Sequence, residues 1–582
     1  MKLFAVAVDY DGTIAFNDAV DPGVRNAIAE LRARGVTVLL ATGRILDELR
    51  RAAGDLHFVD AVIAENGAVL HFPESDHTTT LGPPVPAVLI DELARRGLKF
   101  GVGQSLVDAA AADAPALLDV IRAFELPLVL IFNKGRVMTT VQGVSKGTGL
   151  HAALDTLRLS ARNTMAIGDA ENDHELLRLA EVGAAVPWGS AALRALADLT
   201  LPGNGPGAVA VAVRELAGRG ELPEVPRPRR RLVLGRTEDG REFSLAARGR
   251  NVLIAGDTRS GKSWVAGLLC EQMILHGYCV CVLDPEGDYR SLEVLPGVTE
   301  LGGDDPPPTP RQLMRALRYP DRSVVIDLSK QPQDAKRAYI RSALPALNVL
   351  RRHTGLPHRI VLDEAHYFLH GDDAGLLDLD RNGYTVISYC ASRLPAPLLA
   401  ATAVMIVTCE SNPVELENLR RRCVDCRPMH DGEWDSLRHL RPGQAVVLPV
   451  TQESEGRLRL VNVARRLTPH VRHRQKYVDV PVSEAHAFVF AVNGAGGPAR
   501  LRTLREFVHH LEAAPRAAIE PYAVRGDFSR WIRDVFGDFA LAAELGALEA
   551  QARATPDSET VVGIADAIRS RYELIEEPVA AA

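Results

Sequence analysis

Cysteine is scarce in this chain, with 7 residues among 582. A sparse and odd number of cysteines excludes a disulfide-built scaffold and favours a reducing compartment, so we expect a cytoplasmic protein. Long apolar runs are also missing. None approaches the ~18 residues of a transmembrane helix, and the first run, residues 3–8, is too short for the core of a signal peptide. We therefore expect no membrane among the partners.

Lysine is rare as well, because only 8 of the 67 basic residues are lysines. Each lysine is therefore an informative position. Hydrophobic residues make up 47% and charged residues 24%, which is typical of a folded protein and excludes a disordered chain or a collagen-like fibre. The net charge of −7 gives no global indication of binding to nucleic acid or to an anionic membrane.

The length predicts about four domains at roughly 150 residues each. Short β-rich runs alternate with helical patterns in two stretches, which predicts an α/β protein with two doubly wound parallel-sheet domains. We place the first domain at 1–217, with a small α/β cap at about 83–140, and the second at 232–470. The Pro- and Arg-rich segment 218–231 reads as a linker. A small, mostly helical domain follows at 485–582.

Two carboxylates, Asp9 and Asp11, lie two residues apart just beyond an apolar strand expected at 4–8. In an open α/β sheet, ligands bind at the carboxyl ends of the strands, where such side chains can converge. Acidic turns with glycine are common, so this motif alone is a modest signal. Three further motifs fit the same site. They are a hydroxyl after the next strand, a lysine that opens a helix and an acidic cluster after a later strand, at 42–44, 145–147 and 168–173.

In order, spacing and strand placement, these four motifs resemble those of the haloacid dehalogenase (HAD) superfamily. Glu65, Asn66 and Gly67 resemble its Cof-type (IIB) phosphatases. The resemblance implies a Rossmann-like domain that hydrolyses phosphate monoesters with Mg²⁺. Asp9 would attack phosphorus and form an aspartyl-phosphate, while Asp11 would protonate the leaving oxygen and later activate water.

The same resemblance implies roles for the other motif residues. Thr42 and Lys146 would hold the phosphoryl oxygens, with Gly43 in support, and Asn172 would orient Lys146 or a metal-bound water. The magnesium ligands would come from Asp9, Asp11, Asp169 and Asp173. An alternative for the last two is that they only cap the helix that starts near position 171.

A second site begins at residue 256, where the chain matches G-x-x-x-x-G-K-[ST] between an apolar strand, 252–255, and a helical run. That context identifies a phosphate-binding P-loop. Backbone N–H groups would wrap the phosphates of ATP, the lysine would reach the β- and γ-phosphates, and the serine would coordinate Mg²⁺. The predicted nucleotide-binding residues are Gly256, Asp257, Thr258, Arg259, Ser260, Gly261, Lys262 and Ser263.

Another apolar strand, 360–362, ends in the carboxylates of Asp363 and Glu364. Asp363 would bind the magnesium ion through water, and Glu364 would polarise the attacking water. A carboxylate in that role makes hydrolysis of ATP a better prediction than phosphoryl transfer to an acceptor.

The P-loop, the acidic strand end and the run that holds Asp284 and Glu286 resemble the HerA/FtsK/VirB4 class of ATPases, with HerA-like proteins the most similar. The resemblance implies a RecA-like domain over about 231–470. The chain departs from the class at Ser392, where the class carries a glutamine sensor, so γ-phosphate sensing would be altered. Arg393 remains a candidate phosphate contact.

Members of this class form hexameric rings that move nucleic acid or protein, which implies a homo-oligomer with double-stranded DNA as a candidate partner. An arginine finger would complete the neighbouring site, and the candidates are Arg420, Arg421 and Arg422. The alternative is a solvated basic helix end stabilised by the helix dipole. Over 231–470, 31 basic residues face 30 acidic ones, so the charge balance does not require DNA.

Two weaker features have structural interpretations. Cys423 and Cys426 with His430 lack the second pair of ligands of a zinc site, so reduced thiols are the better prediction. Near the C-terminus, Phe528 and Trp531 fall on one helical face, which is more typical of a core than of a docking surface. That segment resembles a small uncharacterised module of bacterial proteins.

Three functions stay open. The first is a bifunctional hydrolase, in which a magnesium-dependent phosphatase is fused to a ring-forming HerA-like ATPase and acts on a nucleic-acid end or nucleotide. The second is a phosphatase for a small phosphorylated acid or sugar, such as phosphoglycolate, with a regulatory or assembly ATPase; the short cap favours it, by family analogy. The third is a kinase paired with a phosphatase, and Glu364 argues against it.

Overall fold

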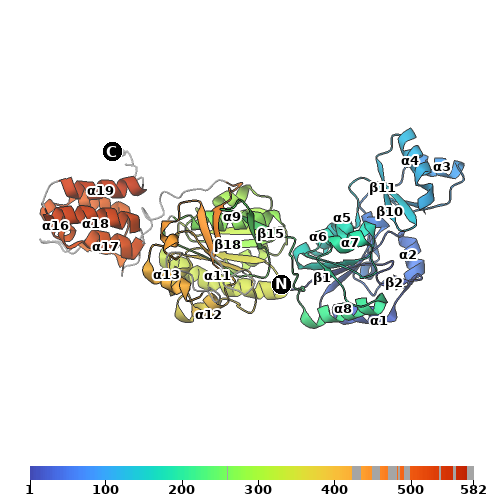
Figure 1. Cartoon of the computed structure of the whole chain (residues 1–582), viewed down its shortest axis with the longest axis horizontal. Coiled ribbons are helices and arrows are strands. Elements are labelled where there is room, and N and C mark those ends of the chain that lie inside the picture. The colour runs from blue at the N-terminus through green and yellow to red at the C-terminus, as the bar shows by residue number, and fades with distance from the viewer. Residues whose placement is uncertain are drawn as a thin grey trace. The chain divides into compact units, whose positions relative to one another are not determined.

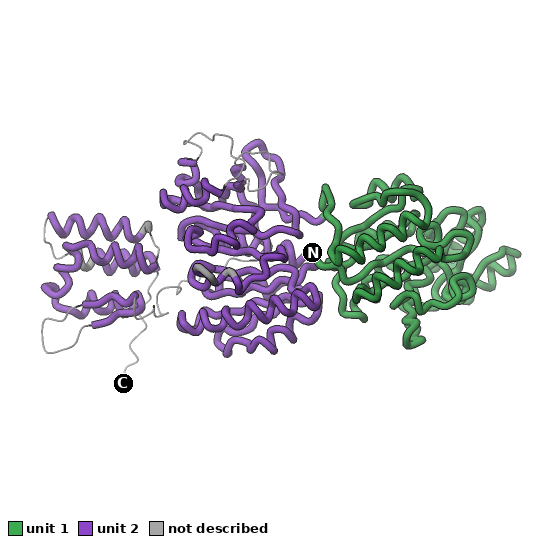
Figure 2. The backbone as a smooth tube through the Cα atoms, turned by 90° about the horizontal axis from the view of Figure 1, so that it is seen from below, with its two compact units in different colours: residues 1–229 green, residues 230–582 purple. Residues whose placement is uncertain are grey.

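The structure is a computed structural model, and it describes most of the chain: residues 1–258, 260–422, 434–448, 459–468, 482, 486–490, 499–536, 539–554 and 559–572. The chain divides into two compact units, Met1–Arg229 and Arg230–Ala582 (Figures 1 and 2). Each unit is organised around its own large β-sheet.

The sheet of the first unit has eight strands in the order β14-β13-β12-β1-β4-β5-β6-β7. The strands from β14 to β5 are parallel, and β6 and β7 add an antiparallel edge. The strands are β1 (Ala5–Asp9), β4 (Thr37–Ala41), β5 (Ala61–Ala64), β6 (Val69–Phe72), β7 (His77–Thr80), β12 (Thr164–Gly168), β13 (Val182–Ala185) and β14 (Leu199–Thr200), beside a small hairpin of β2 (Ala15–Phe16) and β3 (Ala19–Val20). The helices are α1 (Pro22–Ala33), α2 (Leu46–Ala53), α5 (Lys146–Leu157), α6 (His174–Leu179), α7 (Ala191–Leu196) and α8 (Gly205–Arg219).

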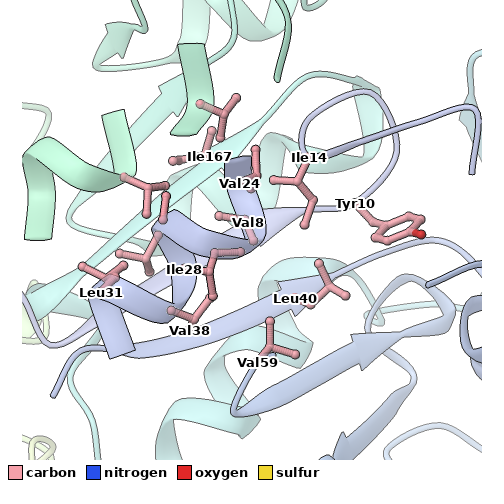
Figure 3. Close-up of a cluster of buried hydrophobic side chains, with 14 of the residues drawn as sticks. Val8, Tyr10, Ile14, Val24, Ile28, Leu31, Val38, Leu40, Val59 and Ile167 are labelled. Atoms are coloured by element: carbon pink, nitrogen blue, oxygen red, sulfur yellow. The ribbon is translucent and has the colours of Figure 1, made fainter. Parts of the chain in front are cut away.

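Helices cover both faces of this sheet, which explains why its central strands β1, β4 and β12 are mainly apolar and are buried at nearly every position. Successive residues of a strand point to opposite faces. Val8 therefore packs in the cluster that includes α1 and α8, whereas Ala7 packs in the cluster that includes α5 and α6. Figure 3 shows the first cluster, in which Ile28 and Leu31 of α1 face the sheet. Because β1, β4 and β12 are parallel neighbours, the residues that follow them meet at one edge of the sheet.

A separate four-stranded antiparallel sheet forms the cap, in the order β10-β11-β9-β8. Its strands are β8 (Phe100–Val102), β9 (Val107–Ala110), β10 (Leu128–Asn133) and β11 (Arg136–Val141), and its helices are α3 (Ala87–Arg95) and α4 (Ala114–Ala123). Leu89 and Leu93 of α3 and Leu117 and Val120 of α4 are fully buried in the cap core. The cap therefore has a hydrophobic core of its own.

The second unit contains an eleven-stranded sheet in the order β16-β15-β25-β24-β23-β17-β22-β21-β18-β20-β19. From β23 to β19 the strands are parallel, and the other four pair antiparallel. The strands are β15 (Arg231–Thr237), β16 (Glu242–Ala246), β17 (Val252–Ala255), β18 (Val280–Asp284), β19 (Val298–Gly302), β20 (Ser323–Asp327), β21 (Arg359–Leu362), β22 (Tyr384–Ser388), β23 (Val404–Val407), β24 (Gln444–Leu448) and β25 (Arg459–Val463). The helices are α9 (Lys262–Leu275), α10 (Pro310–Ala316), α11 (Gln333–Thr354), α12 (Ala396–Ala400) and α13 (Pro413–Arg420).

The C-terminal part of the second unit is mostly helical. It has one hairpin, β26 (Phe488–Phe490) with β27 (Ala499–Leu501), followed by α15 (Leu504–Ala513), α16 (Arg516–Arg525), α17 (Asp527–Trp531), a π-helical turn at Ile532–Phe536, α18 (Phe539–Ala554) and α19 (Glu559–Tyr572). Phe528 and Trp531 are buried against Phe488 and Phe507. The aromatic stripe is thus core, as its spacing indicates.

The predicted fold class, α/β with two parallel-sheet domains and a small helical domain, is confirmed. The strand expected at 252–255 has those bounds, since it is a continuous apolar run between Asn251 and Gly256. Helices α4 and α16 were not predicted; α16 carries an internal proline, Pro521, which hides its pattern. Within the described ranges, every helix is too short or too polar to span a bilayer.

Candidate active sites

The first site lies where β1, β4 and β12 end. Asp9 is the last residue of β1, Thr42 follows β4 and Asp169 follows β12. Lys146 opens α5, whose start is held by a reciprocal pair of bonds between Ser145 and Thr148. The parallel order of the strands thus brings motifs that are far apart in the sequence to one edge.

Lys146 is the centre of this site. Its Nζ donates to Asp9 Oδ1 at 2.6 Å and to Asp173 Oδ1 at 2.7 Å, and all three side chains are buried. Burial disfavours the ammonium form, but the charges of Asp173 and Asp9 outweigh it and raise the pKa of Lys146. Burial and the negative charge of Asp173 raise the pKa of Asp9, and Lys146 opposes them. The positive charge of Lys146 therefore stabilises two buried carboxylates, each of which would be costly to bury without a partner.

The carboxylates of Asp9, Asp169 and Asp173 form a group whose ligand atoms lie within 4.8 Å of one another. Among the residues that the structure describes, Asp9 Oδ2 and Asp169 Oδ1 are buried without a hydrogen-bond partner, a state that is costly for a carboxylate oxygen. Mg²⁺ prefers a small number of carboxylate oxygens, so the donor set fits this ion. Asp173 Oδ2 also accepts the backbone N–H groups of Asp169 and Ala170, at 2.9 and 3.0 Å. Asp173 thus caps its turn locally and binds Lys146 as well.

Asp11 lies outside that group of three carboxylates. Arg44 binds both of its oxygens, with N···O distances of 2.6, 2.8 and 3.1 Å, and also pairs with Asp18. Arg44 was part of a predicted motif but had no predicted role. Thr42 Oγ1 is buried and accepts the backbone N–H of Arg44 at 3.1 Å.

Asn172 and Gly43 lie beside the same cluster. The amide of Asn172 donates to Asn66 Oδ1 at 3.3 Å, so its observed partner is Asn66 and not Lys146. A side chain at Gly43 would come within 2.8 Å of Met138 Sδ in the cap. Gly43 is therefore tightly covered.

Two residues connect core and cap in ways that the sequence did not predict, although Glu65 was named as part of the Cof-type motif. Glu65 is buried and accepts the backbone N–H groups of Gln104 and Ser105 in the cap, at 3.0 and 2.9 Å. Lys134 lies in the turn between β10 and β11, and its Nζ is 2.8 Å from Asp169 Oδ2. The rarity of lysine is the one signal that singles out Lys134.

The second site is the P-loop between β17 and α9. Gly256 has φ +144° and a side chain there would come within 2.5 Å of Cys409 O, so only glycine fits. Lys262 Nζ donates to the carbonyl oxygens of Gly256 and Asp257, at 2.9 and 2.8 Å. Ser260 Oγ contacts Thr408 Oγ1 at 2.5 Å. Among the other predicted loop residues, Thr258 and Gly261 lie in the described part of the loop, and Arg259 lies outside it.

The loop after β18 supplies acidic side chains to the P-loop. Asp288 Oδ2 accepts a hydrogen bond from Ser263 Oγ at 2.9 Å. Asp284 instead accepts the backbone N–H groups of Glu286, Gly287 and Tyr289, at 3.1, 2.7 and 2.9 Å, and so shapes the loop. Burial, then the charge of Asp288, raise the pKa of Asp284.

Glu286 lies 3.9 Å from the buried ammonium of Lys336 on α11. Neither Lys336 nor Asp288 was predicted from the sequence, although Asp288 lies in the same motif as Asp284. Acidic residues that are close neighbours in one loop cannot be told apart by their local pattern.

Asp363 and Glu364 follow β21, which is separated from β17 by β22 alone. Asp363 Oδ1 accepts the N–H of Glu364 at 2.8 Å, and both side chains are buried. Glu364 adopts φ +47° and its carboxylate is 3.6 Å from His366 Nδ1. A buried carboxylate pair near the P-loop is suited to bind a cation and to orient water.

The predicted sensor and arginine positions lie at the ends of β22 and α13. Ser392 N–H donates to Glu415 Oε2 at 2.9 Å, and its hydroxyl donates to Oε1, so this side chain is engaged within the chain. Arg393 is exposed beside it. Arg421 pairs with Glu417 at 3.0 Å. Arg420 is also exposed, and Arg422 is partly so. The predicted thiols at Cys423 and Cys426, with His430, lie outside the described residues.

Known proteins match both parts of the chain. The family described as haloacid dehalogenase-like hydrolase matches residues 6–92 and 125–213, and the family described as helicase HerA, central domain, matches residues 247–330. The resemblances predicted for these two parts are thereby confirmed, and the one for the C-terminal module stays a prediction.

Individual relatives match the first unit. The phosphoglycolate phosphatase of Methanothermobacter thermautotrophicus is 32% identical over 226 residues, which are 37% of this chain and 99% of that protein. The phosphoglycolate phosphatase of Methanopyrus kandleri is 30% identical over 224 residues, 36% of this chain and 96% of that protein. A solved haloacid dehalogenase-like hydrolase from B. subtilis covers 37% of this chain and 100% of its own, with 19% identity and a TM-score of 0.31.

Proposed function

The chain belongs, through its first unit, to the haloacid dehalogenase-like hydrolase family, and we propose that this unit is a magnesium-dependent phosphatase for small phosphate monoesters. One observation carries the proposal. Lys146 holds Asp9 and Asp173 together, while Asp9 Oδ2 and Asp169 Oδ1 are buried without a hydrogen-bond partner in the described part of the chain. This arrangement combines a carboxylate nucleophile with a cation site and a fixed positive charge.

The reaction follows from these groups. Asp9 attacks phosphorus, the ester oxygen leaves, and an aspartyl-phosphate forms. Lys146 neutralises charge on the phosphoryl oxygens, and Thr42 donates its hydroxyl to one of them. Asp11, once it has left Arg44 and carries a proton, gives that proton to the leaving oxygen. As a carboxylate it then takes a proton from the water that attacks the aspartyl-phosphate, which releases inorganic phosphate and restores Asp9. Asp9, Asp169 and Asp173 would hold Mg²⁺, which supplies positive charge that lets one anion approach another.

The substrate class is a small phosphorylated acid, with phosphoglycolate as its example. The relatives that match the whole first unit are named phosphoglycolate phosphatases, and the close cover of Gly43 by Met138 favours a small leaving group. Phosphate release from phosphoglycolate, with and without Mg²⁺, tests this. Asp9→Asn should abolish release, and Asp91→Asn, an exposed aspartate of α3, is the matched control. Release that survives Asp9→Asn would refute the proposed nucleophile.

We also propose that the second unit binds and hydrolyses MgATP. The contact between Ser263 and Asp288, together with the carboxylates of Asp363 and Glu364 at the end of β21, two strands away from β17, favours a cation site at the P-loop. Lys262 would exchange its carbonyl partners for phosphate oxygens when ATP enters the loop. Ser263 and Asp363 would hold Mg²⁺, and Glu364 would orient the attacking water.

A hexameric ring, completed by an arginine among Arg420, Arg421 and Arg422, and translocation along double-stranded DNA are the further proposals for this unit. A regulatory ATPase that does not bind DNA is the second candidate, because the charge of the unit is nearly balanced. ATP hydrolysis with and without double-stranded DNA decides between them, with Lys262→Ala and Asp9→Asn as controls. A Lys262-dependent rate that rises several-fold with DNA supports the motor. A rate that is indifferent to DNA supports the regulatory module.

A further inference from the structure

We propose that Lys134 is the residue by which the cap selects phosphate monoesters with a negatively charged leaving group. The inference rests on the phosphatase proposed above and names the feature of the substrate that its cap would recognise. Lys134 is the residue of the β10–β11 turn whose ammonium enters the catalytic edge of the core sheet. Its Nζ is 2.8 Å from Asp169 Oδ2 and 3.3 Å from the carbonyl oxygen of Asp11.

Lys134 lies where a cap residue would contact the leaving group of a substrate. Asp169 belongs to the carboxylate group around Asp9, so a phosphate attacked by Asp9 lies within reach of this ammonium. A side chain at Gly12 would come within 2.4 Å of both Asp169 Oδ2 and Lys134 Nζ, so the chain leaves just enough room for the lysine to enter. The contact therefore depends on glycine at position 12.

Lys134 differs from the other cations near the site in how firmly it is held. Lys146 is fully buried between two carboxylates, and Arg44 binds Asp11 and Asp18. Arg136, two residues along the same hairpin, pairs with Asp108 of the cap itself. The side chain of Lys134 is 53% exposed, and the carboxylate that it pairs with, Asp169, is a candidate metal ligand.

A cation at the metal site would compete with Lys134 for Asp169. Positive charge at Asp169 repels an ammonium, so Lys134 must turn to another anion when Mg²⁺ binds. The phosphoryl oxygens already have Lys146 and the metal. Lys134 would then pair with a carboxylate on the leaving group. A charge-assisted hydrogen bond between the two would be strong in this partly buried site.

The backbone supports a functional reason for lysine at this position. Lys134 adopts φ +53°, a left-handed conformation that glycine and asparagine adopt most easily. Gly135 follows it in the turn, and a side chain there would meet nothing within 4 Å. Lysine thus occupies a turn position whose backbone conformation disfavours residues with side chains. The side chain of this lysine is the one that reaches Asp169.

The experiment compares two esters that differ by a carboxylate, phosphoglycolate and ethyl phosphate, with the full chain in Mg²⁺. Lys134→Met should lower the ratio of their kcat/KM values at least about tenfold, mainly by raising KM for phosphoglycolate, because a site built for a charge loses its partner. Lys134→Arg should restore much of the ratio. Lys99→Met, an exposed cap lysine, should leave it unchanged. An unchanged ratio in Lys134→Met, or an equal loss for both esters, overturns the proposal.

Binding separates this inference from the phosphatase proposal. Calorimetry with phosphoglycolate and with ethyl phosphate in Mg²⁺ uses Asp9→Asn and the double variant Asp9→Asn/Lys134→Met. A wild-type chain that hydrolyses neither ester refutes the proposed activity but not the cap assignment. In that case weaker binding by the double variant to phosphoglycolate alone supports Lys134, and equal binding by both variants overturns it.

Discussion

Ser263 of the P-loop donates a hydrogen bond to Asp288, which follows β18, with 2.9 Å between Oγ and Oδ2. The two residues lie on different strand–loop segments of the second unit, and Asp288 is largely buried. In the proposed ATPase, Ser263 is a magnesium ligand. Asp288 is therefore in a position to orient that ligand or to accept a bond from water on the metal.

Asp288→Asn should weaken magnesium-dependent ATP hydrolysis. An amide retains the shape but loses the charge that holds the Ser263 hydroxyl and neighbouring water, and partners of this kind are worth about 10–100-fold in metal affinity or activity. The measurement is the Mg²⁺ concentration that gives half-maximal ATPase rate. Asp321→Asn, an exposed aspartate of the same unit, should behave like the wild type. An unaltered magnesium requirement in Asp288→Asn would mean that Asp288 only shapes the loop.

Lys146→Met should destabilise the first unit as well as inactivate it. Without the ammonium, Asp9 and Asp173 are left as buried neighbours with no positive charge between them, a change that typically costs about 3–5 kcal/mol. Calorimetric unfolding of the full chain checks the loss. Lys146→Met/Asp173→Asn should recover part of it, because one of the two repelling charges is gone. A double variant as unstable as the single one would contradict the role of the ion pairs.

Glu410→Gln should change the pH dependence of the second unit. Burial, then the charge of Asp257, raise the pKa of Glu410 from 4.5 to about 9. Between these values the folded state keeps a proton that the unfolded state has lost, so the free energy of unfolding falls as pH rises, by at most about 1.4 kcal/mol per pH unit. The glutamine removes this dependence.

The measurement for Glu410 is the unfolding temperature of the full chain at pH 6 to 9. The variant should lose less stability than the wild type over this range. Glu417→Gln, on the exposed side of α13, serves as the control. Parallel pH curves for the wild type and Glu410→Gln would show that this carboxyl does not titrate in that window.

Glu65→Gln should loosen the attachment of the cap. The carboxylate accepts two backbone N–H groups from the cap loop, and an amide can accept with only one of its two groups. One buried donor is then unsatisfied, at a cost of about 1–3 kcal/mol. Hydrogen exchange at Gln104 and Ser105 should accelerate. Exchange in β10 and β11, which do not contact Glu65 through these bonds, should stay as in the wild type.

The sequence by itself determined the architecture and most of the residues that meet at each site. Continuous apolar runs ended by acidic or glycine residues defined β1, β12 and β17, and parallel order then required that the residues after them share an edge. Asp9 and Asp169 could be grouped for that reason, and Lys146 joined them through the order and spacing of the motifs. A P-loop was recognisable because its two glycines, lysine and serine lie within eight successive residues, 256–263.

Only the tertiary structure decided which side chains bind one another across those edges. Nothing in the local pattern shows that Arg44 takes both oxygens of Asp11, or that Asp284 shapes a loop while Asp288 reaches Ser263. Lys134 likewise lies in a cap inserted between two motifs, far along the chain from Asp169. Such contacts depend on how separate segments pack, and packing is set by the whole core, whereas strand ends and phosphate loops are set by a few adjacent residues.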